Sequence, residues 1–235
     1  LSHLKKGYIM KILERQPSEK ARSYAIRVLL YNITALELPP GSSVSENEVS
    51  SVMNISRTPV REALIELSRM DLVDILPKRG SFISKIDYGL IEESRFMRLV
   101  LETAIVKLAC EQGISSYYME LLEKNLRQES SLSNTQDFSV QLELDNHFHQ
   151  LLFESVGKSR TFDIIYSQMI HFDRLRILSL KSWQDARVVK DHQNILYAIR
   201  QKDSELAEML ITRHLTRFQV EKAELTKRYP DYFTL

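Results

Sequence analysis

Apolar positions recur at helical spacing in three short segments of the first third of the chain. The segments 20–36 and 46–53 are separated by a Pro-Pro-Gly sequence, which ends a helix. Ser45 is expected to cap the second segment by accepting a hydrogen bond from the amide of Glu48. The third segment starts after Ser56, which can cap it in the same way. The pattern predicts one helix followed by a pair of helices that are joined by a very tight turn.

Two short runs with strand-forming residues follow these helices. They cover 72–76 and 81–86 and are separated by a Pro-Lys-Arg-Gly turn, which predicts a β-hairpin with a basic tip. Three helices and such a hairpin form a winged helix-turn-helix, which we expect over residues 20–86. Residues 1–19 precede this pattern as an extension to which the sequence assigns no role.

From Asp87 onward the pattern is helical almost throughout. Glycines and polar breaks divide this part into about six amphipathic segments, 88–112, 114–132, 136–156, 160–181, 185–201 and 203–227. The chain is therefore predicted to be mainly α, with the winged helix-turn-helix followed by an all-α bundle of about six helices in residues 87–235.

Composition and charge narrow the class of protein. The whole chain carries a net charge of +1, but residues 1–86 hold 13 Lys and Arg against 9 Asp and Glu, whereas residues 87–235 hold 19 against 22. A basic front module fits a nucleic-acid partner. No apolar run approaches the roughly 20 residues that cross a bilayer, so we expect a cytoplasmic protein without a membrane partner. The single cysteine, Cys110, excludes an internal disulfide and is expected to be a small buried hydrophobe.

The third predicted helix carries the most specific string of the sequence. Arg57 and Arg61 are four residues apart and share the side of the helix opposite its apolar face. Guanidinium groups there can pair with guanine in the major groove, and neighbouring hydroxyls can hold phosphates. The alternative is an ordinary solvated arginine pair beside the helix's own glutamates. The candidate DNA-binding residues are Ser56, Arg57, Thr58, Pro59 and Arg61 in the helix, with Lys78, Arg79 and Gly80 in the hairpin.

Residues 20–86 resemble the winged helix-turn-helix of the GntR family of bacterial transcription regulators. The resemblance is carried by Leu38-Pro39-Pro40-Gly41, Ser45-Glu46-x-Glu48-Val49, Ser56-Arg57-Thr58-Pro59-Val60-Arg61-Glu62-Ala63-Leu64 and Pro77-x-Arg79-Gly80. It implies that Arg57 and Arg61 contact bases of double-stranded operator DNA and that Gly80 lets the wing tip approach the duplex. Asn47 and Asp71 depart from the family pattern, which usually has an arginine and a glycine there.

Carboxylate and imidazole groups interrupt the apolar stripes of the second part. Asp145 and His149 lie on the inward stripe of the segment 136–156, and His192 and His214 lie on the stripes of two later segments. Burial of such groups without partners costs several kcal/mol, roughly, so something must satisfy them. One possibility is a divalent ion such as zinc, nickel, manganese or iron, because imidazole with carboxylate suits these metals. The other possibility is a set of core histidines with ordinary hydrogen bonds.

Residues 87–235 resemble the FCD ligand-binding domain of FadR-type GntR regulators, in a VanR-like six-helix variant. The carriers are Arg98-x-x-x-Glu102, Asp145-x-x-x-His149, Asp191-His192 and His214. The resemblance implies a metal ion held by Asp145, His149, His192 and His214, with open coordination positions facing a cavity for an organic acid. Arg98 is a candidate carboxylate clamp, since guanidinium pairs bidentately with carboxylates, and Arg174 is a second. For each of them, an ion pair within the protein is the alternative.

These observations favour a homodimeric DNA-binding regulator that senses a small carboxylate. A homodimer is expected because one helix-turn-helix reads only a half-site. The first alternative is a metal-dependent enzyme that uses the Asp/His site, although an enzyme has no need for the arginine-bearing helix. The second alternative is an interaction module whose histidines only tie the bundle together and bind no metal.

Overall fold

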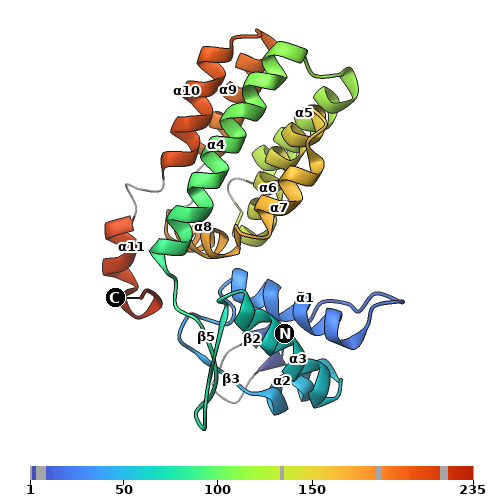
Figure 1. Cartoon of the computed structure of the whole chain (residues 1–235), viewed down its shortest axis with the longest axis vertical. Helices are drawn as coiled ribbons and strands as arrows, with labels where there is room; N and C mark the ends of the chain where they lie inside the picture. The colour runs from blue at the N-terminus through green and yellow to red at the C-terminus, as the bar shows by residue number, and fades with distance from the viewer. Residues whose placement is uncertain (1, 4–8, 133–134, 184–186, 218–221, 235) are drawn as a thin grey trace. The chain divides into compact units, whose positions relative to one another are not determined.

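A computed structural model of the chain describes residues 2–3, 9–132, 135–183, 187–217 and 222–234 (Figure 1). The chain divides into two compact units. One comprises Leu1–Tyr88 together with Thr226–Leu235, and the other comprises Gly89–Leu225. No helix among the described residues has the length and apolar character needed to span a membrane.

The helices of the first unit form a small three-helix core. They are α1 (Ala21–Thr34), α2 (Glu46–Met53) and α3 (Arg57–Arg69), as the apolar pattern predicted. Their buried side chains include Val28, Leu29, Val49, Val60, Leu64 and Leu67. The prediction for Ser45 is confirmed, since its hydroxyl accepts from the Glu48 amide. Ser56 occupies the N-cap position of α3, but its side chain makes no capping hydrogen bond, so that prediction is wrong.

The predicted hairpin is the wing of this unit. Strands β4 (Val73–Leu76) and β5 (Gly80–Ile83) pair antiparallel, and β3 (Ser43–Val44) pairs with the other edge of β5. Asp71, just before β4, adopts a left-handed backbone with φ of 56°. This conformation favours glycine, which agrees with the glycine that the family resemblance implies at this position.

The N-terminal extension packs against α1. Strands β1 (Ser2–His3) and β2 (Ile9–Met10) pair antiparallel. Met10 is fully buried, and the Lys11 backbone exchanges two hydrogen bonds with the amide side chain of Asn32. The described part of the extension therefore belongs to the core of the first unit, which the sequence did not predict. Residues 4–8 of the extension lie outside the described residues.

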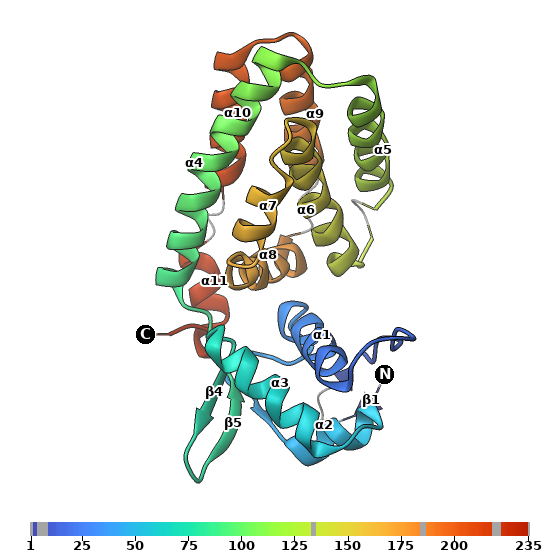
Figure 2. The same ribbon diagram turned by 45° about the vertical axis from the view of Figure 1, so that its right-hand side comes forward.

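The second unit is an all-α bundle. Its helices are α4 (Tyr88–Gln112), α5 (Ser116–Leu132), α6 (Phe138–Ser155), α7 (Ser159–Tyr166), α8 (Ile170–Trp183), α9 (Arg187–Arg200) and α10 (Ser204–Thr216). Figures 1 and 2 show α4 alongside α10, where Lys107 pairs with Glu208 at 2.6 Å. Cys110 is buried in this core, as expected.

The number of helices corrects the prediction of a six-helix bundle. The expected segment 160–181 is two helices, because the α-helix is interrupted between Tyr166 and Ile170. There the amides of Gln168 and Met169 donate to carbonyl oxygens three residues earlier. Neither glycine nor proline lies at this break, so it could not be predicted from the helix-breaking residues. The segment 203–227 likewise contains α10 and the short helix α11 (Lys222–Arg228).

The end of the chain returns to the first unit. A short 3-10 helix at Pro230–Tyr232 leads to Phe233, which forms a parallel bridge with Ile86. Two backbone hydrogen bonds hold this bridge, at 2.8 and 3.0 Å, and the ring of the buried Phe233 stacks on Tyr88 at 5.0 Å. The sequence placed residues 226–235 in the second domain, whereas they pack with the first unit.

Candidate DNA-reading surface and metal centre

The two arginines of α3 lie on the solvent side of the helix. Their side chains are 65% and 69% exposed for Arg57 and Arg61, while Val60 and Leu64 on the opposite face are buried. Both guanidinium groups reach the same carboxylate, that of Glu46 at the first turn of α2, with N–O distances of 3.7 and 3.2 Å. Their partner in the protein is thus Glu46, and not the glutamates of α3 that the sequence suggested.

The remaining predicted DNA-contacting residues are also accessible. Ser56 and Thr58 are exposed beside the two arginines, and Pro59 is half-buried in the first turn of α3. At the wing tip, Lys78, Arg79 and Gly80 are all exposed. Lys78 and Gly80 both have positive φ, 61° and 99°, and no atom lies within 4 Å of where a side chain on Gly80 would begin. The wing therefore presents a narrow basic tip to solvent.

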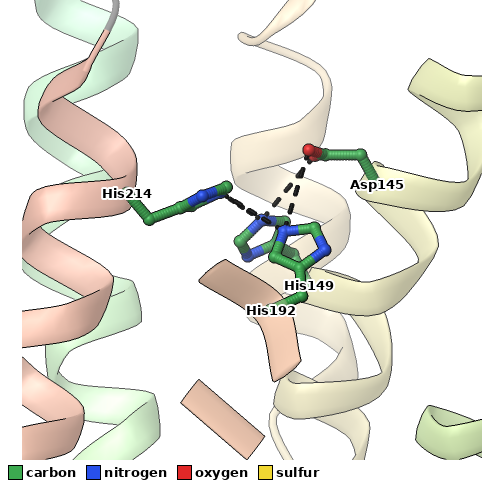
Figure 3. Close-up of side chains that lie close together, drawn as sticks. All are labelled: Asp145, His149, His192 and His214. Atoms are coloured by element: carbon green, nitrogen blue, oxygen red, sulfur yellow. Dashed lines mark hydrogen bonds and ion pairs between the residues drawn. The ribbon is translucent and has the colours of Figure 1, made fainter. Parts of the chain in front are cut away.

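Four predicted metal ligands meet inside the second unit. One ligand atom from each of Asp145, His149, His192 and His214 lies within 4.8 Å of the other three. Figure 3 shows the three imidazoles and the carboxylate pointing toward one another. The His214 Nε2 is 3.2 Å from the His149 Nε2 and 3.4 Å from the His192 Nε2. Asp145 approaches His149 and His192 at 3.7 and 3.8 Å.

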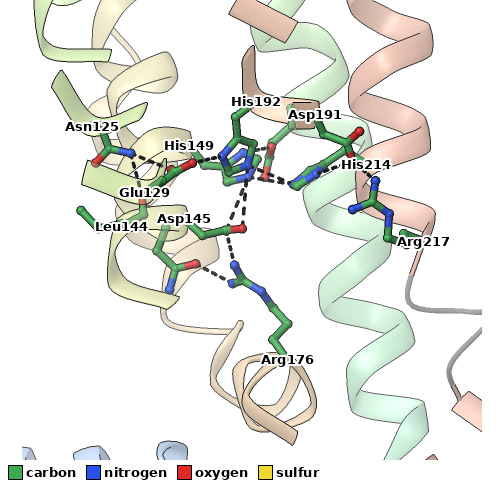
Figure 4. A network of polar contacts seen from close by, with 12 residues as sticks. Asn125, Glu129, Leu144, Asp145, His149, Arg176, Asp191, His192, His214 and Arg217 are labelled. Atoms are coloured by element: carbon green, nitrogen blue, oxygen red, sulfur yellow. Dashed lines mark hydrogen bonds and ion pairs between the residues drawn. The ribbon is translucent and has the colours of Figure 1, made fainter. Parts of the chain in front are cut away.

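Each imidazole has a carboxylate at its other nitrogen, and Figure 4 shows Glu129 beside His192 and Asp191 beside His214. The Nδ1 of His149 is 2.5 Å from Glu102, that of His192 is 2.9 Å from Glu129, and that of His214 is 3.5 Å from Asp191. A carboxylate at Nδ1 favours the tautomer with the proton on Nδ1, which leaves the lone pair on Nε2. Three Nε2 lone pairs then face one another, and a cation between them would relieve their repulsion.

Burial sets the protonation of these groups. It lowers the pKa of His214 to about 4, and together with the nearby Arg98 it lowers the pKa of His149 well below its usual value. Burial opposes the charged form of His192 too, but Glu129 outweighs it and raises that pKa. Burial likewise opposes the charge of Asp145, yet Arg176 and the histidines hold its pKa well below the usual range. Ionised carboxylate and neutral imidazole are the forms that ligate metals.

The donor set fits a divalent metal ion. Two nitrogens at about 2.0–2.1 Å from one zinc-like ion lie about 3.0–3.4 Å apart at ordinary coordination angles, which matches the observed Nε2 separations. The carboxylates behind the histidines are the partners that metal-bound imidazoles usually have. His147 and His171 lie outside this group: His147 is exposed, with its ring bonded to Asn125 at 2.9 Å.

A cavity of about 120 Å³ adjoins the four candidate ligands. Asp145 and His214 form part of its wall, and so do the guanidinium groups of Arg98, Arg176 and Arg217. The predicted clamp Arg98 is 2% exposed, and its Nε donates to Glu102. The Nη2 of Arg98 is buried with no hydrogen bond and lies 3.8 Å from Asp145.

The cavity does not include the second predicted clamp. Arg174 is fully buried in α8, but it is absent from the cavity wall, where Arg176 stands. Arg176 donates to Asp145, to Asn146 at 2.6 Å and to Asp173 at 2.9 Å. Arg176 could not be chosen over Arg174 from the sequence, because residues two apart in a helix point to opposite sides and a choice between them needs the rotation of α8.

Comparisons with known proteins assign both halves of the chain. The FCD domain model matches residues 93–217, and the model of bacterial regulatory proteins of the gntR family matches residues 25–83. The HTH-type transcriptional repressor RspR of Escherichia coli K12 is 29% identical over 93% of this chain and 96% of its own. An HTH-type transcriptional regulator in an unstable DNA locus of Streptomyces ambofaciens is 31% identical over 86% of this chain and 84% of its own.

Solved structures share the fold. The chain of E. coli McbR/YncC superposes with a TM-score of 0.72 at 17% identity, covering 90% of this chain and 99% of that one. A GntR transcriptional regulator from Rhodococcus sp. RHA1 gives a TM-score of 0.69 at 21% identity, covering 88% of this chain and 98% of that one.

Proposed function

Because the chain belongs to the GntR family of bacterial regulatory proteins and carries an FCD domain, we propose that a small organic acid bound beside a divalent metal ion controls its binding to operator DNA. The DNA-binding and effector-binding roles of the two halves are those of the family. Its relatives are transcription regulators and not enzymes, so the alternative of a metal-dependent enzyme is set aside. We assign operator binding to residues 20–86 and effector binding to the helical domain from residue 87, in a cytoplasmic protein.

The metal belongs to the proposal on the strength of the donor set. Asp145, His149, His192 and His214 would hold the ion, and the three carboxylates behind the histidines would orient the rings. A divalent ion with protein ligands of this kind supplies a positive centre that accepts an oxygen donor in an open position. Zinc, nickel, manganese and iron all suit this mixture of nitrogen and oxygen ligands.

The observation that carries the effector proposal is the unused nitrogen of Arg98. A buried guanidinium nitrogen without a hydrogen bond is costly, and Arg98 presents one on the wall of a cavity that also contains two candidate metal ligands. A carboxylate in that cavity would accept a hydrogen bond from this nitrogen. Its two oxygens would also serve as ligands in the open position of the metal. The other nitrogens of the cavity's polar wall are considered below.

DNA binding is proposed to use the exposed side of α3 and the wing. Arg57 and Arg61 would contact base edges. Ser56, Thr58 and Pro59 would place the first turn of α3 against the DNA backbone. Lys78, Arg79 and Gly80 would contact the duplex from the wing. These are the contacts that the family resemblance implies.

A homodimer is part of the proposal because two-fold operators need two reading helices. A surface for it exists on the outer side of α4, where Phe96 and Val100, four residues apart, are 65% and 52% exposed. Large apolar side chains on one stripe of a helix favour contact with another protein surface. We expect two chains per operator in the DNA complex.

The test is a titration of candidate acids with and without operator DNA, with the mass of the complex measured in the same samples. An effector that controls DNA binding must change operator affinity, and by reciprocity saturating operator must change effector affinity by the same factor. A coupling of about 1–3 kcal/mol corresponds to roughly 5–150-fold. Acids that bind equally well to free and operator-bound protein would contradict the proposal.

A further inference from the structure

The cavity beside the metal centre has two unlike ends. Its polar wall carries Asp145, His214 and the arginines, whereas the rest of it is largely apolar. Seven of its fifteen described lining residues are aliphatic or aromatic, namely Leu142, Phe172, Leu175, Leu180, Val188, Val189 and Leu215. We propose that the effector is a monocarboxylate with a small apolar body, and not a hydroxylated acid or a dicarboxylate. This inference rests on the proposed function.

The hydrogen-bonding groups of the polar wall are mostly occupied. Arg176 donates to Asp145, Asn146 and Asp173, Arg217 donates to Asp191, and Glu129 accepts from Asn125 and His192. The amide nitrogen of Gln141 donates to two backbone carbonyl oxygens at 2.9 Å each. Against these, the Nη2 of Arg98 is buried without a hydrogen bond. The wall thus offers a place for one carboxylate beside the metal and few partners for further polar groups.

Charge favours a single carboxylate. Among the described residues, the ion pairs of the cluster involve five carboxylates, those of Glu102, Glu129, Asp145, Asp173 and Asp191, and four guanidinium groups, those of Arg98, Arg176, Arg213 and Arg217, together with the three imidazoles. With ionised carboxylates and neutral imidazoles, these groups carry one excess negative charge, and a divalent ion would change it to one excess positive charge. One carboxylate then neutralises it, whereas a second would restore an uncompensated negative charge in a buried site.

Size limits the apolar body. An apolar cavity of roughly 150 Å³ accommodates benzene, and the cavity here is about 120 Å³. A body of about four or five carbon atoms therefore fills it. A hydroxyl group placed among Leu175, Val188 and Leu215 would lose its hydrogen bonds to water and gain few in return. This loss should lower the affinity of a hydroxylated acid by roughly tenfold or more.

Three acids of five carbons test this inference: pentanoate, glutarate and a 2,3,4,5-tetrahydroxypentanoate. Each is titrated calorimetrically into the full chain loaded with zinc. We expect pentanoate to bind at least about tenfold more tightly than the other two. Zinc alone in solution prefers the hydroxy acid and the dicarboxylate, because both can chelate it. The expected ranking is thus the reverse of the metal's own, and only the cavity wall can produce it.

A wall variant makes the test specific to the cavity. Val188→Thr adds a hydroxyl to the half-buried wall with little change of shape, so the preference for pentanoate should fall severalfold while the zinc content stays the same. Ser179→Ala, which removes a hydroxyl from the same cavity, is the control and should not weaken the preference.

The outcomes separate this inference from the proposed function. Equal or tighter binding of glutarate or the tetrahydroxy acid would overturn the inference and leave an acid-sensing regulator in place. The same holds if Val188→Thr keeps the full preference. If the zinc-loaded chain bound none of the three acids, the proposed organic-acid effector and the inference would both be wrong.

Discussion

The candidate DNA-contacting residues lie between positions 56 and 80 and are exposed on one helix and one hairpin, whereas the four candidate metal ligands span positions 145 to 214 and are gathered in the interior of a bundle. Exposed ion pairs such as those of Arg57 and Arg61 with Glu46 contribute little to stability, because water screens them. Buried polar clusters are costly when any member loses its partner. Substitutions at the first site should thus change recognition without affecting the fold, and substitutions at the second should change both.

The largest effect is expected on operator affinity. The double substitution Arg57→Ala, Arg61→Ala would remove two base contacts that are worth about 1–3 kcal/mol each. Specific binding should therefore fall roughly a hundredfold or more, while the melting temperature stays unchanged. Binding is measured by fluorescence anisotropy at fixed salt.

A matched control is available at the other end of α3, where Arg69 of α3 and Arg22 of α1 meet one carboxylate. Arg22 and Arg69 share Glu66 in the way that Arg57 and Arg61 share Glu46, and they are also exposed. Arg22→Ala, Arg69→Ala removes the same charge, so it should weaken only the salt-dependent, non-specific part of binding. Equal losses in the two double variants would show that α3 does not read bases.

The second effect is expected on metal content and stability together. Purified protein should hold about one divalent ion per chain, and His192→Ala should lower that occupancy, because its ring would supply one of the four ligand atoms. A ligand that binds only the folded state at 1,000 times its Kd stabilises the fold by about 4 kcal/mol, so the melting temperature should fall as well. Elemental analysis and calorimetry measure the two quantities.

His147→Ala is the control for the metal prediction, since His147 lies two residues from a ligand but is exposed and outside the group. It should change neither metal content nor melting temperature. If wild type and His192→Ala contained the same amount of metal, the four-residue centre would be an ordinary cluster of core histidines.

The same contrast explains what the sequence could predict. The candidate DNA-reading element is a local string, so its helices, the Ser45 cap and the exposure of both arginines followed from the sequence pattern. For the metal centre, helical stripes identified the four inward residues. The carboxylates beside the rings could not be assigned in this way. Glu129 reaches the ring of His192 from another helix, and Asp191 reaches the ring of His214 from another helix. Their role depends on helix rotation and packing, which periodicity does not determine.

The return of the chain end to the first unit was also beyond sequence reasoning. Phe233 is one of three aromatic residues in the last seven positions, and its burial goes with a bridge to Ile86, far away in the sequence. Phe233→Leu keeps most of the buried volume but removes the stack on Tyr88, which should cost about 1 kcal/mol. Hydrogen exchange at the amides of Ile86 and Thr234 should then quicken, while exchange in α9 and α10 stays the same. Unchanged protection at both amides would show that the stack does not hold the tail.

The smallest effect is expected at the turn before the wing, and it has the opposite sign. Asp71 is exposed and adopts φ of 56°, where a side chain is strained and glycine is not. Its backbone N–H donates to Ser68 and its carbonyl accepts from the Ser84 hydroxyl, and neither bond needs the carboxylate. Asp71→Gly should therefore stabilise the first unit by about 0.5–1 kcal/mol, less the extra freedom that glycine gives the unfolded chain. Asp74→Gly is the control, because it makes the same change at an exposed position in the extended backbone of β4 and should destabilise the wing. Slower hydrogen exchange in β4 and β5 for the first variant and faster exchange for the second are expected. If both variants shifted exchange in the same direction, the backbone at Asp71 would not be the source of strain.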